Sequence, residues 1–189
     1  MKRFEPVVEN CLLRNEWFEG RSVLYEMDES GYMDYFECVR DECDGRMHDK
    51  QLKFLDEFGG LCIGYMGPDH EEQELEFCDC VFATSVLCYP DYEKFVAPIE
   101  ECVGTLAAIG NMVEQRIAFV MDPAGAVYAL PCDVRQNGRP DHVMVLLGID
   151  GDTFLKNAIL GKLFSEATPI VRAAGTLVKK LRYEPFPQY

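Results

Sequence analysis

Apolar residues in this chain recur every three to four positions in some segments and at alternate positions in others. The first pattern predicts helices over residues 4–15, 31–43, 48–58, 89–104 and 153–164. Alternation and short apolar runs predict strands over residues 61–66, 74–77, 105–109, 116–121, 125–130 and 142–147. We therefore expect an α+β fold, an antiparallel sheet of about five or six strands flanked by helices.

The junction between the third helix and the first strand has the clearest local signals. Phe54, Leu55 and Phe58 fall on one apolar face of the helix. Gly59 is expected to end the helix in a left-handed conformation, and Gly60 to let the chain reverse without a Cβ penalty. This segment therefore predicts a helix, a sharp stop and a strand.

Four motifs carry a resemblance to a known family. They are Trp17-x-x-Gly20-Arg21, Phe54-Leu55-x-x-Phe58-Gly59-Gly60-Leu61, Val103-Gly104 with Ile109-Gly110, and Asp122-x-x-Gly125-x-Val127-Tyr128. Together they resemble the SUKH superfamily, in particular its bacterial immunity-protein group, over about residues 17–164. The resemblance implies a small α+β fold. It also implies that Val103-Gly104 and Ile109-Gly110 are a helix end and a turn, and that the last motif is a hairpin.

The same resemblance implies a function. Members of this group are often encoded beside secreted toxins, which they bind and neutralise in the producing cell. The resemblance thus implies a cytoplasmic immunity protein that binds a protein toxin domain, has no enzyme activity and needs no cofactor. An adaptor of the same fold that binds another cellular protein is the alternative. The motif residues are mainly architectural, so they bear on the fold more than on the partner.

The charge is unevenly distributed along the chain. The net charge is −15, and residues 1–104 hold 25 acidic and 9 basic residues, whereas residues 105–189 hold 8 and 9. An acidic surface disfavours nucleic acid and anionic membranes as direct ligands, because both need Lys and Arg. A basic protein, such as a nuclease toxin, is the natural counterpart. Ordinary solubility is the alternative reason for such acidity.

One short segment concentrates this charge. It places six acids in eleven residues without a Lys or Arg: Asp69, Glu71, Glu72, Glu74, Glu76 and Asp79. Leu75 and Phe77 alternate with two of these glutamates, which predicts a half-buried strand with the glutamates on its solvent face. We interpret the six acids as partner-binding residues. A solvated loop with no partner is the alternative.

The cysteines and histidines give little support for catalysis or metal binding. The nine cysteines are an odd number and lie mostly in apolar segments, which indicates free thiols in a reducing compartment. Cys78, Cys80 and Cys88 are the best zinc candidates, but no second pair with zinc-finger spacing accompanies them. The three histidines lie in none of the usual metal or catalytic motifs. A cysteine–histidine dyad stays open, because such partners meet in space rather than in sequence.

The length of 189 residues suits one domain with an extension. We expect a domain over residues 1–164 and a basic C-terminal extension over residues 165–189, packed on the domain or on a second subunit. The extension contains Arg172, Lys179, Lys180 and Arg182. No apolar run of eighteen residues and no secretory signal occur, so we expect a cytoplasmic protein. The oligomeric state does not follow from the sequence.

Overall fold

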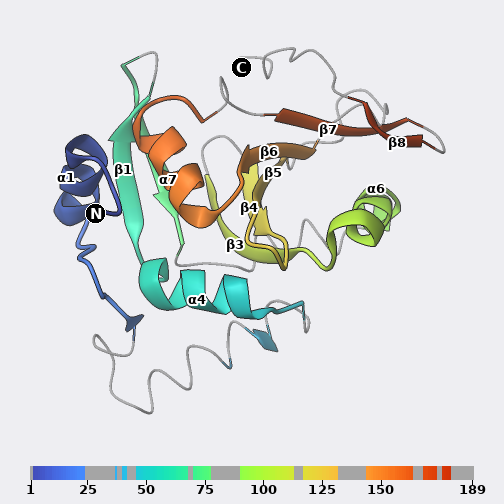
Figure 1. Ribbon diagram of the computed structural model, residues 1–189, viewed down its shortest axis with the longest axis horizontal. Coiled ribbons are helices and arrows are strands. Elements are labelled where there is room, and N and C mark those ends of the chain that lie inside the picture. The colour runs from blue at the N-terminus through green and yellow to red at the C-terminus, as the bar shows by residue number, and fades with distance from the viewer. Residues whose placement is uncertain are drawn as a thin grey trace.

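The computed structural model describes residues 2–23, 37, 40–41, 46–67, 70–77, 90–112, 117–131, 144–163, 168–173 and 176–179. Within these residues the longer helices are α1 (Pro6–Arg14), α4 (Asp49–Phe58), α6 (Pro90–Val103) and α7 (Gly151–Ile159). The strands are β1 (Cys62–Met66), β2 (Glu72–Glu76), β3 (Ala107–Met112), β4 (Ile117–Met121), β5 (Val127–Pro131), β6 (Met144–Gly148), β7 (Thr168–Ala173) and β8 (Thr176–Lys179). Figure 1 shows their arrangement.

The strands form one antiparallel sheet in which each strand lies beside its neighbour in sequence, from β1 at one edge to β8 at the other. The expected α+β fold with a sheet of five or six strands is confirmed by β1–β6. Strands β7 and β8 come from the basic extension, and β7 pairs with β6. They extend the sheet to eight strands. The domain boundary at residue 164 stays a prediction.

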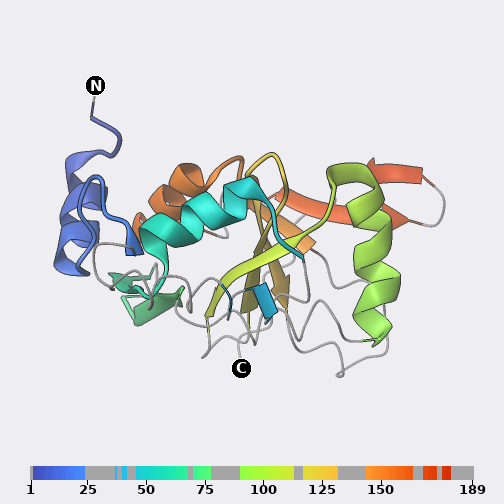
Figure 2. The ribbon, with the colours of Figure 1, turned by 90° about the horizontal axis from the view of Figure 1, so that it is seen from below.

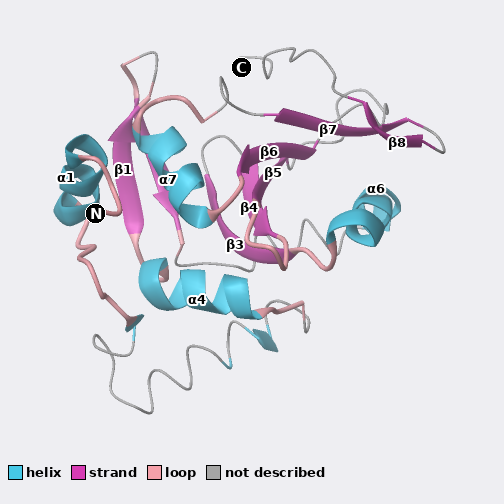
Figure 3. Cartoon of the chain, viewed as in Figure 1, coloured by secondary structure: helices cyan, strands magenta, loops and turns pink. Residues whose placement is uncertain are grey.

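Three of the described helices cover one face and one edge of this sheet. Helices α4 and α7 lie side by side on one face (Figure 2), and α1 lies beside β1 (Figure 3). Strands β3 and β4 are buried at every position. Burial at every position means that both faces of these two strands are covered, so they form the centre of the core.

Aromatic rings connect these layers. Trp17 stacks on Phe58 of α4 with 6.2 Å between ring centroids, and it meets Phe4 edge-on at 5.4 Å. Phe77, just after β2, contacts Phe58 and also Phe154 of α7 at 6.3 Å. Buried aromatic rings contribute much of the hydrophobic stabilisation of a small domain. Trp17 therefore joins the N-terminal segment to the body of the protein.

Most described elements lie near their predicted positions, and the last helix is shorter than expected. The predicted helix over residues 31–43 falls mostly outside the described residues. The last helix was expected to reach residue 164, but α7 ends at Ile159. Gly161 takes a positive φ of 68° there, and Lys162 N–H donates to Asn157 O at 2.7 Å. This left-handed residue closes the helix.

The double glycine after α4 differs from its prediction. Gly59 is not left-handed, with φ −56° and ψ 144°, whereas Gly60 has φ 77°. Gly60 N–H donates to Phe77 O at 3.2 Å, and Phe77 N–H donates to Leu61 O at 2.9 Å. Gly60 and Leu61 thus oppose the single residue Phe77, a β-bulge whose first position requires a left-handed glycine.

The Val103-Gly104 and Ile109-Gly110 motif has two different roles. Gly104 follows the end of α6 with φ 90°, as the predicted helix end requires. Gly110 does not form a turn, because it lies inside β3 at an irregularity in the pairing with β4. A Cβ at Gly110 would meet the carbonyl oxygen of Glu76 at 2.2 Å. Glycine is needed there so that β2 can approach β3 closely.

Candidate functional site

The β1–β2 hairpin has one buried and one exposed side. Ile63 pairs with Leu75 on the buried side, and both are fully buried. The exposed side carries three cross-strand pairs: Cys62 with Glu76, Gly64 with Glu74, and Met66 with Glu72. Apolar residues alternate with other residues in both strands. Because the apolar side chains must face the core, this alternation fixes the orientation of the hairpin. We call the side chains of Glu72, Glu74 and Glu76 the acidic face.

The acidic face contains only part of the predicted partner-binding set. Glu72 and Glu74 are exposed and Glu76 is half-buried on the same strand face, while Glu71 is exposed just before β2. Asp69 and Asp79 lie outside the described residues. The predicted half-buried strand with glutamates toward solvent is present.

The geometry of the acidic face suits long cationic side chains. Alternate residues on one strand are about 6.8 Å apart, so three carboxyl groups line up along β2. Met66, with 51% of its surface exposed, lies directly across from Glu72. A lysine or arginine could place its charge at the carboxylates and its alkyl stem on the thioether.

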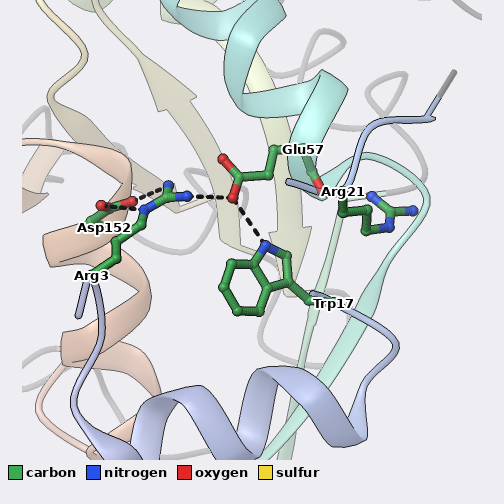
Figure 4. Close-up of polar contacts among 5 residues, drawn as sticks. All are labelled: Arg3, Trp17, Arg21, Glu57 and Asp152. Carbon is green, nitrogen blue, oxygen red and sulfur yellow. Dashed lines mark hydrogen bonds and ion pairs between the residues drawn. The ribbon is translucent and has the colours of Figure 1, made fainter. Parts of the chain in front are cut away.

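A second cluster of charged groups joins the N-terminus to α4 and α7 (Figure 4). Arg3 donates two hydrogen bonds to Asp152, at 2.7 and 2.5 Å, and a third to Glu57. Glu57 also accepts from the indole N–H of Trp17 at 3.0 Å. The hydrogen bonds to Asp152, and then the one to Glu57, raise the pKa of Arg3. Because every member bonds to another, this cluster is architectural.

Arg21 of the Trp-x-x-Gly-Arg motif binds the end of α4. Its guanidinium donates to Glu57 O at 2.6 Å and to Gly59 O at 3.0 Å, and the residue is buried. These carbonyls belong to the last turn, where the helix dipole favours a cation. Gly20 has φ 81°, and the turn closes with Arg21 N–H donating to Phe18 O at 3.0 Å. The motif thus aims Arg21 at the helix end.

The Asp-x-x-Gly-x-Val-Tyr motif is the turn between β4 and β5. Asp122 Oδ1 accepts from the backbone N–H groups of Ala124, Gly125 and Ala126, at 2.9 to 3.0 Å. Asp122 Oδ2 accepts from the Tyr128 hydroxyl at 2.7 Å. Burial and this hydrogen bond raise the pKa of Tyr128. The motif therefore satisfies a buried carboxylate entirely with groups of its own turn.

His48 has a structural role that the sequence reasoning missed. Its Nδ1 accepts from Gln51 N–H at 3.1 Å at the start of α4, and its Nε2 lies 2.9 Å from Met121 O. The two contacts fix the tautomer, with the proton on Nε2. Histidine is not among the usual helix-capping residues, so the sequence did not indicate that His48 caps α4.

The described part of the chain contains no group of three or more His, Cys, Asp or Glu residues placed to hold a metal ion. Among the described cysteines, Cys11 is buried, and Cys62 and Cys102 are exposed. The zinc candidates Cys78, Cys80 and Cys88 lie outside the described residues. Among the described helices, none is both long enough and apolar enough to cross a membrane.

Comparison with models of known protein families identifies the family of this chain. The sequence model described as SUKH-3 immunity protein matches residues 4–161. The chain belongs to the SUKH-3 immunity protein family. Comparisons with curated proteins and with solved structures give no match. The family match covers α1 through α7, and hence both the acidic face and the Arg3 cluster.

Proposed function

We propose that this SUKH-3 family protein neutralises a toxin domain by binding it in the cytoplasm of the producing cell. Membership of an immunity protein family supports the role. The acidic face is the observation that carries the choice of surface, because it aligns Glu72 and Glu74, both exposed, on one strand. Binding alone is sufficient for this function, with no catalytic step and no cofactor.

The partner that best fits the acidic face is a basic surface, such as the nucleic-acid-binding surface of a nuclease toxin. Covering that surface would keep the toxin from its substrate. Opposite charge increases the rate of encounter and orients the partners, and the net charge of −15 adds to both effects. The same charge disfavours direct binding to nucleic acid or an anionic membrane. Residues 165–189 are proposed to form a basic extension, packed on the domain or on a second subunit.

The test begins with the gene neighbourhood. We expect a gene for a large secreted protein with a variable C-terminal domain immediately upstream. The purified C-terminal domain should bind this chain in calorimetry, and co-expression of this chain should protect cells from it. Reversal of Glu72, Glu74 and Glu76 to lysine should abolish both binding and protection. The melting temperature should be nearly unchanged, because the acidic face lies outside the core.

A matched control separates this surface from net charge. Reversal of Glu19, Glu37 and Asp41 to lysine changes the charge equally, and all three are exposed on other segments. This control variant should bind and protect as the wild type does. Unaltered inhibition by the acidic-face variant would refute the proposed surface. Failure of the wild-type chain to bind or protect would favour the alternative, an adaptor for another cellular protein.

A further inference from the structure

Strand β1 lies at the edge of the sheet formed by the described strands, so one side of its backbone faces away from all the others. Gly67 N–H donates to Glu71 O at 2.8 Å, and Phe77 N–H donates to Leu61 O at 2.9 Å. In an antiparallel pair these contacts alternate along the strand, so the odd-numbered residues of β1 bond to β2. The even-numbered residues, with Gly64 in the middle, turn their N–H and C=O groups outward.

The side chain of Asn15 occupies the place of a neighbouring strand at Gly64. Its Oδ1 accepts from Gly64 N–H at 3.1 Å, and its Nδ2 donates to Gly64 O at 3.3 Å. Nδ2 also donates to Cys11 O at 2.8 Å, which orients the amide, and Cys11 Sγ lies 3.5 Å from Gly64 O. One residue at the end of α1 thus pairs with both backbone groups of Gly64, the central residue of the edge that an added strand would use.

The other end of this segment is fastened by Arg3. Its contacts with Asp152 and Glu57 tie the chain to α7 and α4 just before α1 begins. Between the two ends, Val8 and Leu12 of α1 are fully buried. Helix α1 is therefore held by apolar contacts along its length and by polar contacts at its two ends, those of Arg3 before the helix and those of Asn15 after it. Both figures of the ribbon place it at the β1 end of the molecule.

We propose that α1, held in place by these contacts, covers the β1 edge and keeps this chain from pairing with a second copy of itself. The exposed edge would be self-complementary, because antiparallel pairing centred on Gly64 relates two identical strands by a twofold axis. The strand Cys-Ile-Gly-Tyr-Met carries no charge that would oppose such pairing. Uncovered apolar edges of this kind are templates for strand addition.

The acidic face opposes the same pairing, but more weakly. In a paired dimer the two copies of β2 would lie three strand spacings apart, about 14 Å. The screening length at physiological ionic strength is about 8 Å. Repulsion between the two rows of glutamates is therefore largely screened in the cell, and α1 is the main barrier. It follows that pairing of an uncovered edge should strengthen as salt is added.

The test removes the polar contacts of Asn15 and of Arg3, separately and together. Asn15→Ala removes the contact at Gly64, Arg3→Met removes the contacts at α4 and α7, and Asn10→Ala is the control on the exposed side of α1. Hydrogen exchange at the Gly64 amide should accelerate about tenfold in Asn15→Ala, as expected for loss of one hydrogen bond. The double variant Arg3→Met/Asn15→Ala should form a concentration-dependent dimer in sedimentation that the wild type and Asn10→Ala do not form.

A disulfide variant tests the register and does not depend on the folding of the double variant. Pairing centred on Gly64 places Cys62 opposite position 66 of the other copy, within disulfide distance. Under mild oxidation, Asn15→Ala/Met66→Cys should form a dimer linked between these positions, and Met66→Cys alone should not.

Each measurement has a result that overturns the proposal. Unchanged exchange of the Gly64 amide in Asn15→Ala would show that Asn15 does not cover this edge. A folded double variant that keeps the wild-type mass at every protein and salt concentration would show that the exposed edge does not self-pair. Absence of the linked dimer in Asn15→Ala/Met66→Cys would contradict it equally.

Discussion

At the scale of single residues, the family motifs are positions where backbone geometry or backbone hydrogen bonding allows few alternatives. Gly60 is the left-handed first residue of a bulge, and an L side chain costs about 1–2 kcal/mol in that conformation. We predict that Gly60→Ala lowers the free energy of unfolding by this amount in urea denaturation. Gly64→Ala is the control, because among the described residues its Cβ would meet Asn15 Oδ1 alone, at an ordinary 3.8 Å. Equal losses in the two variants would contradict the assignment.

Arg21 gives a second prediction at this scale. Arg21→Met keeps the length of the side chain but removes the donors to Glu57 O and Gly59 O. Hydrogen bonds from a charged donor contribute more than neutral ones, so we expect a loss of about 2 kcal/mol in the free energy of unfolding. Arg14→Met is the matched control, because Arg14 is exposed and donates to Asn10 O at 3.2 Å. The control should change stability by less than about 0.5 kcal/mol.

At the scale of elements, the sequence predicted the kind of each labelled element from α1 to α7 more accurately than its details, whereas strands β7 and β8 were not predicted. Hydrophobic periodicity carries the signal for α4, β1 and the β4–β5 hairpin, because each has one face in the core. It carries no information about which glycine becomes left-handed, since Gly59 and Gly60 are chemically identical and the pairing partner Phe77 decides between them. The role of Gly110 was likewise hidden, because it depends on the approach of β2 from another part of the chain.

The turn between β4 and β5 predicts a pH dependence. Burial and the hydrogen bond to Asp122 raise the pKa of Tyr128 above its ordinary value near 10. Between that value and the raised one, the unfolded chain releases the proton and the folded chain keeps it. The folded state binds more protons there, so its stability should fall as pH rises above about 10.

Tyr128→Phe isolates this contribution. The variant should be less stable than the wild type at pH 8 by about 1 kcal/mol, because the hydrogen bond to Asp122 is lost. Above about pH 10 its stability should fall less steeply than that of the wild type, so the two curves should converge. Urea denaturation at several pH values measures both. Parallel curves over this range would show that Tyr128 does not cause the alkaline loss.

At the scale of the whole molecule, the candidate site followed from the sequence only in part. Alternation of Glu74 and Glu76 with apolar residues was enough to predict an exposed acidic strand, because a period of two needs no tertiary information. The neighbours of that strand were not predictable. Met66 faces Glu72 only through the register of the hairpin, and α1 reaches the β1 edge only in the folded chain. The Arg3 contact with Asp152 spans 149 residues and has no local signal.

The concentration of negative charge in one half of the chain predicts a measurable cost to the free protein. Glu72 and Glu74 lie on the same strand face, and 25 of the 33 acidic residues precede residue 105. Their repulsion is relieved by screening, so Glu72→Lys/Glu74→Lys should be more stable than the wild type at about 0.01 M salt, where screening is weak. The difference should be a few tenths of a kcal/mol and should vanish near 1 M salt. Urea denaturation at both salt concentrations measures it. A variant less stable than the wild type at low salt would mean that these glutamates stabilise the free fold, and hence that a binding role is not needed to account for them.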